Sequence, residues 1–242
     1  FKQKEDLKTI KNLMNKGKLL EAKELLLSIK ARNKLDHIGF HLLATIYKIK
    51  SDHLTALNLL NKSIKINPNY AEAYADVGAI YLLINNLSMA IKYSEKSLKI
   101  KPEGLVPNVN LGLIYKKLGK NKIALNYFSQ AIKINPNDSN LYYYVGLLYD
   151  KLGDYNKTIF FYRKSFLINP KNGNAFSQLF YIYLKNFDWR SIKLINSELS
   201  RFGIKSFEGG NPAIFLHYDD DPYKHKLRSE QFFKYFNKKA FL

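Results

Sequence analysis

The dipeptide Asn67-Pro68 belongs to a series of prolines at a fixed distance along this sequence. Its counterparts are Lys101-Pro102, Asn135-Pro136 and Asn169-Pro170, so that successive prolines are 34 residues apart and three of the four follow an asparagine. A period kept to the residue over four copies is typical of a repeat protein, and a period of 34 indicates a helix-turn-helix unit. Proline ends the second helix of each unit, because it lacks an amide hydrogen and disfavours helix for the residue before it.

The residues between the prolines follow one pattern, in which the proline is counted as position 32. Small residues at positions 8 and 20 let the two helices of a repeat approach closely, and a tyrosine at position 11 fills the space one turn on. At position 15, where the first helix ends, we expect a residue that tolerates a positive φ. Position 8 is Ala44, Gly78, Gly112 and Gly146; position 11 is Tyr47, Tyr81, Tyr115 and Tyr149; position 15 is Ser51, Asn85, Gly119 and Gly153; position 20 is Ala56, Ala90, Ala124 and Thr158.

This pattern resembles the tetratricopeptide repeat family. The resemblance implies an all-α fold, a right-handed superhelical α-solenoid of helix-turn-helix units, with first helices on the concave face and second helices on the convex face. The expected domains are a degenerate repeat at 3–36, four repeats at 37–70, 71–104, 105–138 and 139–172, degenerate capping helices at 173–202, and a junction segment with a final helix at 203–242.

In this family, partner peptides lie in the concave groove, which is lined mainly from positions 2, 5, 6, 9, 12 and 13. The last two full repeats would present an apolar and aromatic patch there, which is typical of a partner site. The alternative is that neighbouring helices cover much of it. The candidate partner-binding residues are His41, Thr45, Asp76, Val109, Asn110, Leu113, Tyr143, Tyr144 and Leu147.

The groove sequence also argues against two ways of holding a peptide. Chaperone-binding members of the family clamp a terminal carboxylate with Lys, Asn and Arg at positions 2, 5, 6 and 9. No run of three repeats here supplies that set, so we expect no chaperone carboxylate clamp. Glycosyltransferase members of the family use a ladder of Asn at position 6, which only Asn110 would fit.

The formal net charge of +19 raises the question of nucleic-acid or membrane partners. The basic residues are overwhelmingly lysine, whereas arginine is the better ligand for phosphate and bases. The lysines of the second helices fall at positions 26 and 29, which predicts a solvated convex stripe. We therefore expect neither nucleic acid nor membrane as a partner. Separately, we expect a cytoplasmic protein. The stripe consists of Lys62, Lys65, Lys96, Lys99, Lys133 and Lys164.

No catalytic constellation is evident in the repeats. Cysteine is absent, which excludes thiolate chemistry, and there is no glycine-rich phosphate loop. The repeat spacing offers no partner set to His37, His41 or His53. The stretch HYDDDPYKH at 217–225 has the residue types of a metal site, but an aspartate directly before Pro222 is more typical of a helix N-cap. We predict no cofactor, no metal ligand and no catalytic residue for this chain.

The tail carries a second resemblance. Asp188 is placed to cap a helix in which apolar residues recur at helical spacing from Ile192 to Phe202. The order of motifs after residue 187 is similar to the junction that follows the repeats in bacterial proteins resembling O-linked N-acetylglucosamine transferases. This implies that a glycosyltransferase region, with the catalytic residues, follows Leu242. The motifs are Asp188-Trp189, Asn211-Pro212, Phe215-Leu216 and Asp220-Asp221-Pro222.

The sequence therefore predicts a protein–protein interaction solenoid that binds partner or substrate peptides in its groove, as the N-terminal part of a glycosyltransferase-like protein. The alternative is a freestanding scaffold or adaptor for a multiprotein assembly, with weak self-association left open. A third hypothesis is an enzyme in its own right, with a metal at the three aspartates. Partner identity does not follow from these residues.

Overall fold

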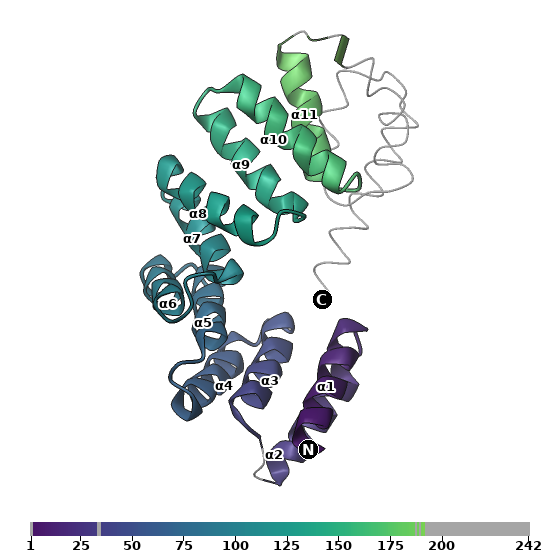
Figure 1. Ribbon diagram of the computed structural model, residues 1–242, viewed down its shortest axis with the longest axis vertical. Helices are drawn as coiled ribbons and strands as arrows, with labels where there is room; N and C mark the ends of the chain where they lie inside the picture. Colours follow the sequence, from purple (N-terminus) through teal and green to yellow (C-terminus); the bar gives the residue numbers. More distant parts are fainter. Residues whose placement is uncertain (1, 33–34, 187, 189, 192–242) are drawn as a thin grey trace. The chain divides into compact units, whose positions relative to one another are not determined.

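The computed structural model describes residues 2–32, 35–186, 188 and 190–191. These residues form eleven α-helices and no strand (Figure 1), which confirms the all-α helical repeat fold. The chain divides into an N-terminal unit, Phe1–Leu118, and a C-terminal unit, Gly119–Leu242. The division falls between the two helices of the repeat expected at 105–138, a boundary that the proline period does not mark.

Consecutive helices joined by tight turns pack side by side, as α3 with α4, α5 with α6 and α9 with α10 (Figure 1). No helix of the described part of the chain is both long and apolar enough to span a bilayer. The helices of the N-terminal unit are α1 (Lys2–Asn15), α2 (Leu19–Ala31), α3 (His37–Ile49), α4 (His53–Ile66), α5 (Ala71–Leu83), α6 (Leu87–Ile100) and α7 (Leu105–Lys117). Those of the C-terminal unit are α8 (Asn121–Ile134), α9 (Ser139–Lys151), α10 (Tyr155–Ile168) and α11 (Gly173–Lys185).

The turn inside each repeat closes one helix and opens the next. The residue at position 15 has a positive φ in all four copies, which confirms the expectation even for the serine. At position 16, the side chains of Asp52, Asn86 and Asp154 accept a hydrogen bond from the amide three residues on and so cap the second helix. The φ angles at position 15 are 60° at Ser51, 62° at Asn85, 72° at Gly119 and 75° at Gly153.

The second helices end just before the periodic prolines. The residues before the prolines have left the helical conformation, with φ near −133° at Asn67 and −137° at Asn169. Proline at the next position has no amide hydrogen to continue the ladder, so the helix stops at the isoleucine one residue earlier. The last helical residues are Ile66, Ile100, Ile134 and Ile168.

Paired helices approach most closely at position 8. A Cβ placed on Gly78 would lie 2.5 Å from Ser94 Oγ, and one on Gly146 would lie 2.6 Å from two ring carbons of Tyr162. The side chains of Ser94 and Tyr162 are fully buried. The small residues expected at position 8 are therefore required at these two crossings.

A buried serine at position 27 ties three second helices to the start of the first helix of the same repeat. Ser63 Oγ donates to the His37 carbonyl at 2.7 Å, Ser97 Oγ to Ala71 at 2.9 Å and Ser165 Oγ to Ser139 at 2.7 Å. Each hydroxyl lies in the core and finds its acceptor there, so no buried donor is left unpaired at this position.

We expect Gly146→Ala to destabilise the protein by about 1–3 kcal/mol, because the buried ring of Tyr162 has no room to withdraw. The better helix propensity of alanine offsets only about 1 kcal/mol of the packing cost. Gly78→Ala should cost less, since the nearest atom is a serine hydroxyl that can rotate, although backbone atoms of Ser94 and Ala90 lie just beyond it. Urea unfolding followed by circular dichroism measures the difference.

The matched control is Ala44→Gly, which removes a buried methyl group at the same position of an earlier repeat, so that it lowers helix propensity and leaves a small space without creating a clash. A Gly146→Ala protein as stable as the parent would contradict the close packing described here.

Candidate functional site

The predicted groove residues of the N-terminal unit lie on three first helices, α3, α5 and α7, of which α5 packs against both others. His41, Thr45, Val109 and Leu113 are partly exposed. By contrast, Asp76 is 8% exposed and Asn110 is 5% exposed. The two position-6 side chains therefore lie beneath the surface that their neighbours form.

Asp76 is the centre of a polar network that joins α3 to α5. Its Oδ2 lies 3.0 Å from His41 Nε2, and its Oδ1 accepts a hydrogen bond from Lys48 Nζ at 2.7 Å. The hydroxyl of Tyr70 lies 2.9 Å from His41 Nδ1. A carboxylate only accepts, so Nε2 of a neutral His41 donates to Asp76 and Nδ1 accepts from Tyr70.

The charges of this network hold Asp76 ionised. Burial alone would raise the pKa of Asp76, but the hydrogen bond from His41 and the adjacent Lys48 outweigh it and lower the pKa below the ordinary value. Burial, together with the charges of Glu72 and Asp76, raises the pKa of Tyr70 to about 12. A nucleophilic tyrosine needs the opposite shift. The arrangement thus orients side chains and holds a charge in place.

The expectation that the repeat spacing gives His41 no partners is wrong. Its partners are Tyr70, the last residue of its own repeat, and Asp76, at position 6 of the next repeat. They meet because α5 packs beside α3, which within-repeat spacing does not reveal. Lys48 was also missed, although it occupies position 12 of the predicted groove. Pairing positions 12 and 6 of neighbouring repeats would have found it.

Asn110, the one residue that fits an asparagine ladder, is engaged within the protein. Its Nδ2 donates to the Ala75 carbonyl at 3.0 Å and so fixes α7 against α5. Similarly, Thr45 Oγ1 donates to the His41 carbonyl one turn earlier, at 3.0 Å. The apolar atoms of Val109 and Leu113 remain partly exposed beside Asn110 on α7.

The predicted groove residues of the C-terminal unit, Tyr143, Tyr144 and Leu147, lie on α9 and are all partly exposed. The two tyrosine rings are 5.6 Å apart between centroids. Behind them, Phe128 of α8 stacks on Tyr144 at 5.3 Å, and Tyr162 of α10 lies 6.0 Å from Tyr143. We call the five side chains of Phe128, Tyr143, Tyr144, Leu147 and Tyr162 the α9 aromatic cluster.

Burial, with a smaller contribution from the neighbouring Tyr144, raises the pKa of the Tyr143 hydroxyl, so this residue stays a neutral donor. On α11, Tyr181 occupies position 9 of the following repeat and is 45% exposed. It was missed because that repeat diverges, although counting 34 residues on from Leu147 would have located it. The patch predicted to join Val109 and Leu113 to these tyrosines draws on both units.

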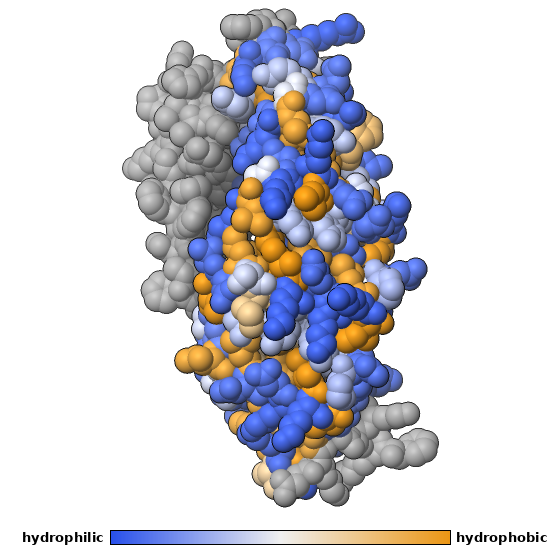
Figure 2. Space-filling model, turned by 90° about the vertical axis from the view of Figure 1, so that its left-hand side faces the viewer, coloured by the Kyte–Doolittle hydropathy of each residue, from blue (hydrophilic) through white to orange (hydrophobic). Residues whose placement is uncertain are grey.

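The lysines predicted to form a stripe on the second helices are exposed in every case, on α4, α6, α8 and α10. Figure 2 shows hydrophilic side chains over much of the face that it presents, with hydrophobic ones between them. Such mixing is ordinary for a protein surface in contact with water. The exposure of these lysines thus agrees with the prediction of a solvated face.

The aspartate-rich stretch at 217–225 and the motifs from 211 to 222 lie outside the described residues. Within the described ranges, no group of three or more His, Cys, Asp or Glu side chains is placed to hold a metal ion. Asp188 does lie inside them, and its Oδ1 accepts a hydrogen bond from the Ser191 amide at 3.0 Å. The prediction that Asp188 caps a helix is thus confirmed, while the apolar residues at 192–202 lie beyond the described part.

We expect Asp76→Asn to lower the free energy of unfolding by on the order of 2 kcal/mol at pH 7, between the values for exposed and buried ion pairs. The pKa of Asp76 is lower in the folded than in the unfolded chain. Its contribution is therefore fully present above the ordinary carboxyl pKa of about 4 and is lost as the pH falls through the lowered value. Urea unfolding at pH 7, 5 and 3 measures this.

The difference between parent and Asp76→Asn should shrink towards zero at the lowest pH. Asp36→Asn is the control, since Asp36 caps α3 through the Gly39 amide and asparagine caps equally well. A difference that stays constant from pH 7 to pH 3 would show that the charge of Asp76 does not stabilise the unit.

Comparisons with known proteins agree with the repeat pattern. Three tetratricopeptide repeat family models match, at residues 71–103, 109–138 and 127–160. No curated protein matches the chain in sequence.

Three solved structures illustrate the likeness of the fold. PilF of Pseudomonas aeruginosa has a TM-score of 0.71 at 16% identity, covering 82% of this chain and 90% of its own. TTC0263, a thermophilic tetratricopeptide repeat protein of Thermus thermophilus, has a TM-score of 0.62 at 18% identity. The match covers 75% of this chain and 98% of TTC0263. MamA has a TM-score of 0.58 at 24% identity, and the match covers 65% of this chain and 93% of MamA. Identities this low show a shared fold alone, whereas the family matches identify tetratricopeptide repeats within residues 71–160 of this chain.

Proposed function

We propose that this chain is a protein-interaction scaffold that holds a segment of a partner protein against its first helices. The observation that carries the proposal is the α9 aromatic cluster, in which Tyr143, Tyr144 and Leu147 are partly exposed while Phe128 and Tyr162 support them from behind. Rings that are already fixed lose little freedom when a partner covers them, and aromatic anchors of this kind dominate binding energy at protein interfaces.

The first helices of the N-terminal unit offer a different chemistry. The buried Asp76 bonds to His41 and Lys48, whose side chains are partly exposed, as are Tyr70 and Thr45. The network fixes the position of the Lys48 ammonium, whose side chain is 23% exposed. A partner segment on this surface would meet oriented polar groups, whereas one on α9 would meet aromatic rings.

A finer proposal is that the scaffold precedes a glycosyltransferase-like region. It rests on the order of motifs from Asp188 to Pro222 alone. The Asn110 amide is engaged with the Ala75 carbonyl, which argues against the asparagine ladder of that class. Sequencing the gene past the codon for Leu242 tests the proposal. A two-lobed glycosyltransferase region would support it, and a different continuation or a stop would favour the freestanding scaffold or adaptor.

We expect the double variant Tyr143→Ala, Tyr144→Ala to lose partner capture in a quantitative pull-down from cells of the source organism. Loss of two anchor rings should weaken binding by about 2 kcal/mol or more. Leu147→Lys tests the same surface without removing a ring, at a partly exposed side chain that packs against the core of the C-terminal unit. Circular dichroism confirms that each variant remains helical.

The matched control is Lys96→Ala, Lys99→Ala, which changes two exposed residues on α6. Partners retained by both α9 variants at the level of the parent would exclude the α9 aromatic cluster as the binding surface.

A further inference from the structure

The outer face of α10 departs from the pattern of the preceding second helices. Position 22 is Asn58, Lys92 and Asn126 in the three earlier repeats but Phe160 on α10, and position 29 is a lysine in all three but Leu167 on α10. Phe160 is 60% exposed and Leu167 is 74% exposed. Two large apolar side chains thus replace polar ones at exposed positions seven residues apart, on one side of the helix.

The array itself shows that regular stacking does not cover these positions. On α4, the polar residues Asn58 and Lys65 are both exposed although α5 packs against that helix. The same holds for Lys92 and Lys99 on α6, against which α7 packs. The next first helix, α11, packs against α10 in the same way and likewise leaves Phe160 exposed. The repeat fold alone does not explain apolar residues at these positions. Burial beneath a partner that is not part of the array does explain them.

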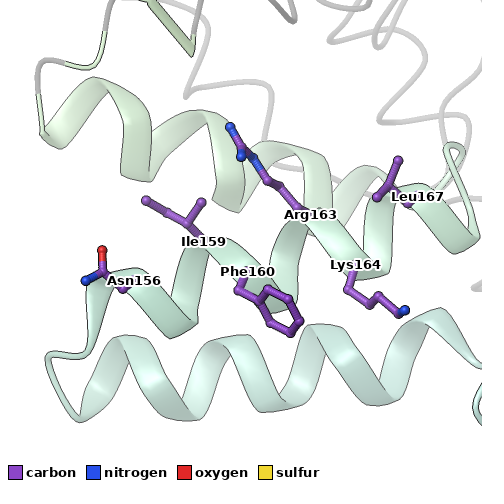
Figure 3. A pocket seen from close by; sticks show the side chains of 6 residues that line it. All are labelled: Asn156, Ile159, Phe160, Arg163, Lys164 and Leu167. Carbon is purple, nitrogen blue, oxygen red and sulfur yellow. The ribbon is translucent and has the colours of Figure 1, made fainter.

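The two apolar residues border an open depression along α10 (Figure 3). Its volume is about 310 Å³, and most of its surface is apolar. At a rise of about 1.5 Å per residue, Phe160 and Leu167 are roughly 10 Å apart along the helix, a distance that matches the i and i+7 anchors of a helix laid along it. The lining residues are Asn156, Ile159, Phe160, Arg163, Lys164 and Leu167.

Two cations flank this apolar strip, one on each side. Arg163 points towards α11, where its Nε donates to the Tyr183 hydroxyl, and Lys164 points towards α9, with its Nζ 5.9 Å from the centre of the Tyr142 ring (Figure 3). Each cation is held by an aromatic residue of a neighbouring helix yet remains exposed. The depression therefore offers an apolar centre with positive charge on both edges.

We propose that the outer face of α10 is a second docking surface, which takes an acidic amphipathic helix of another protein. The charge pattern selects this occupant, because carboxylates on both sides of an apolar helix face would meet Arg163 and Lys164. A second copy is disfavoured by the charge of +19 on each chain. The final helix predicted to begin at Pro222 and to run through Phe236 is disfavoured too, because its sequence has one acidic residue, Glu230, against four cations. These are Lys224, Lys226, Arg228 and Lys234.

Photo-cross-linking in cells tests the proposal. The full chain is produced with p-benzoylphenylalanine in place of Phe160, and the cross-linked peptides are identified by mass spectrometry. We expect a segment of another protein with apolar residues at helical spacing and glutamate or aspartate on both flanks. The same photoreactive residue in place of Asn126, the equivalent position on α8, is the control and should not capture this segment.

The captured segment is then synthesised, and its affinity for the purified chain is measured by fluorescence anisotropy. Leu167→Lys restores the residue of the earlier repeats at a largely exposed site and should weaken binding by about tenfold or more, as expected for loss of an anchor. Lys164→Glu should weaken binding as well, and added salt should reduce the affinity of the parent. Tyr143→Ala, Tyr144→Ala should leave this affinity unchanged, which separates the α10 surface from the first-helix surface of the proposed function.

Four outcomes would overturn the proposal. They are cross-links only to residues 192–242 of the same chain, cross-links only between two copies, capture of a segment without acidic flanks, and no cross-link above the Asn126 control. An affinity unaffected by both Leu167→Lys and Lys164→Glu, with the helical circular dichroism of the chain preserved, would overturn it equally.

Discussion

The close approach of paired helices at position 8 is the constraint on which much of the structure depends. At Gly146 a methyl group would lie 2.6 Å from the Tyr162 ring, and at Gly78 it would meet the Ser94 hydroxyl at 2.5 Å. The facing residue differs widely in size, from serine to tyrosine, while position 8 is glycine in both of these repeats. What is kept is the space between the backbones, since packed interiors tolerate neither a void nor an extra methyl group.

This constraint reaches the candidate binding surface. Because Gly146 leaves room for it, the ring of Tyr162 lies fully buried between α9 and its neighbours, where it supports Tyr143 at 6.0 Å. Gly146 thus sets the orientation of the partly exposed Tyr143, on the same helix, through the ring of Tyr162. In the N-terminal unit the corresponding support is electrostatic, since Asp76 positions His41 and Lys48 through hydrogen bonds of 3.0 and 2.7 Å. The two units stabilise their first-helix surfaces by different physical means.

Features that arise within one repeat were predicted from the sequence, whereas polar contacts between neighbouring repeats were missed. The helix ends before the prolines, the positive φ of Ser51 and the cap at Asp188 all depend on residues a few positions apart. By contrast, the bond between His41 and Asp76 joins neighbouring repeats, and it depends on how α5 is placed beside α3. Periodicity gives the order of the helices but not which polar side chains meet across them.

The division of the chain at Gly119 illustrates the same limit. Gly119 fits its place in the turn pattern as well as Gly153 does, with φ of 72° and 75°. Local backbone geometry is therefore the same at a turn within the C-terminal unit and at the turn where the two units divide. The φ angle of this glycine therefore does not mark where the chain divides.

A repeat protein supplies its own internal comparison, which gives departures from the pattern a physical meaning that a single residue lacks. Some departures from the pattern lie at buried positions, such as Tyr162 where an earlier repeat has Ser94. The neighbouring residues accommodate such a change, so it concerns packing. A departure at an exposed position is not explained by packing against neighbouring residues of the fold. Asn58 and Lys65 show that polar residues serve the fold well at positions 22 and 29, so stability does not require Phe160 and Leu167. Exposed apolar side chains that the fold does not need are best explained by a surface that is covered in use.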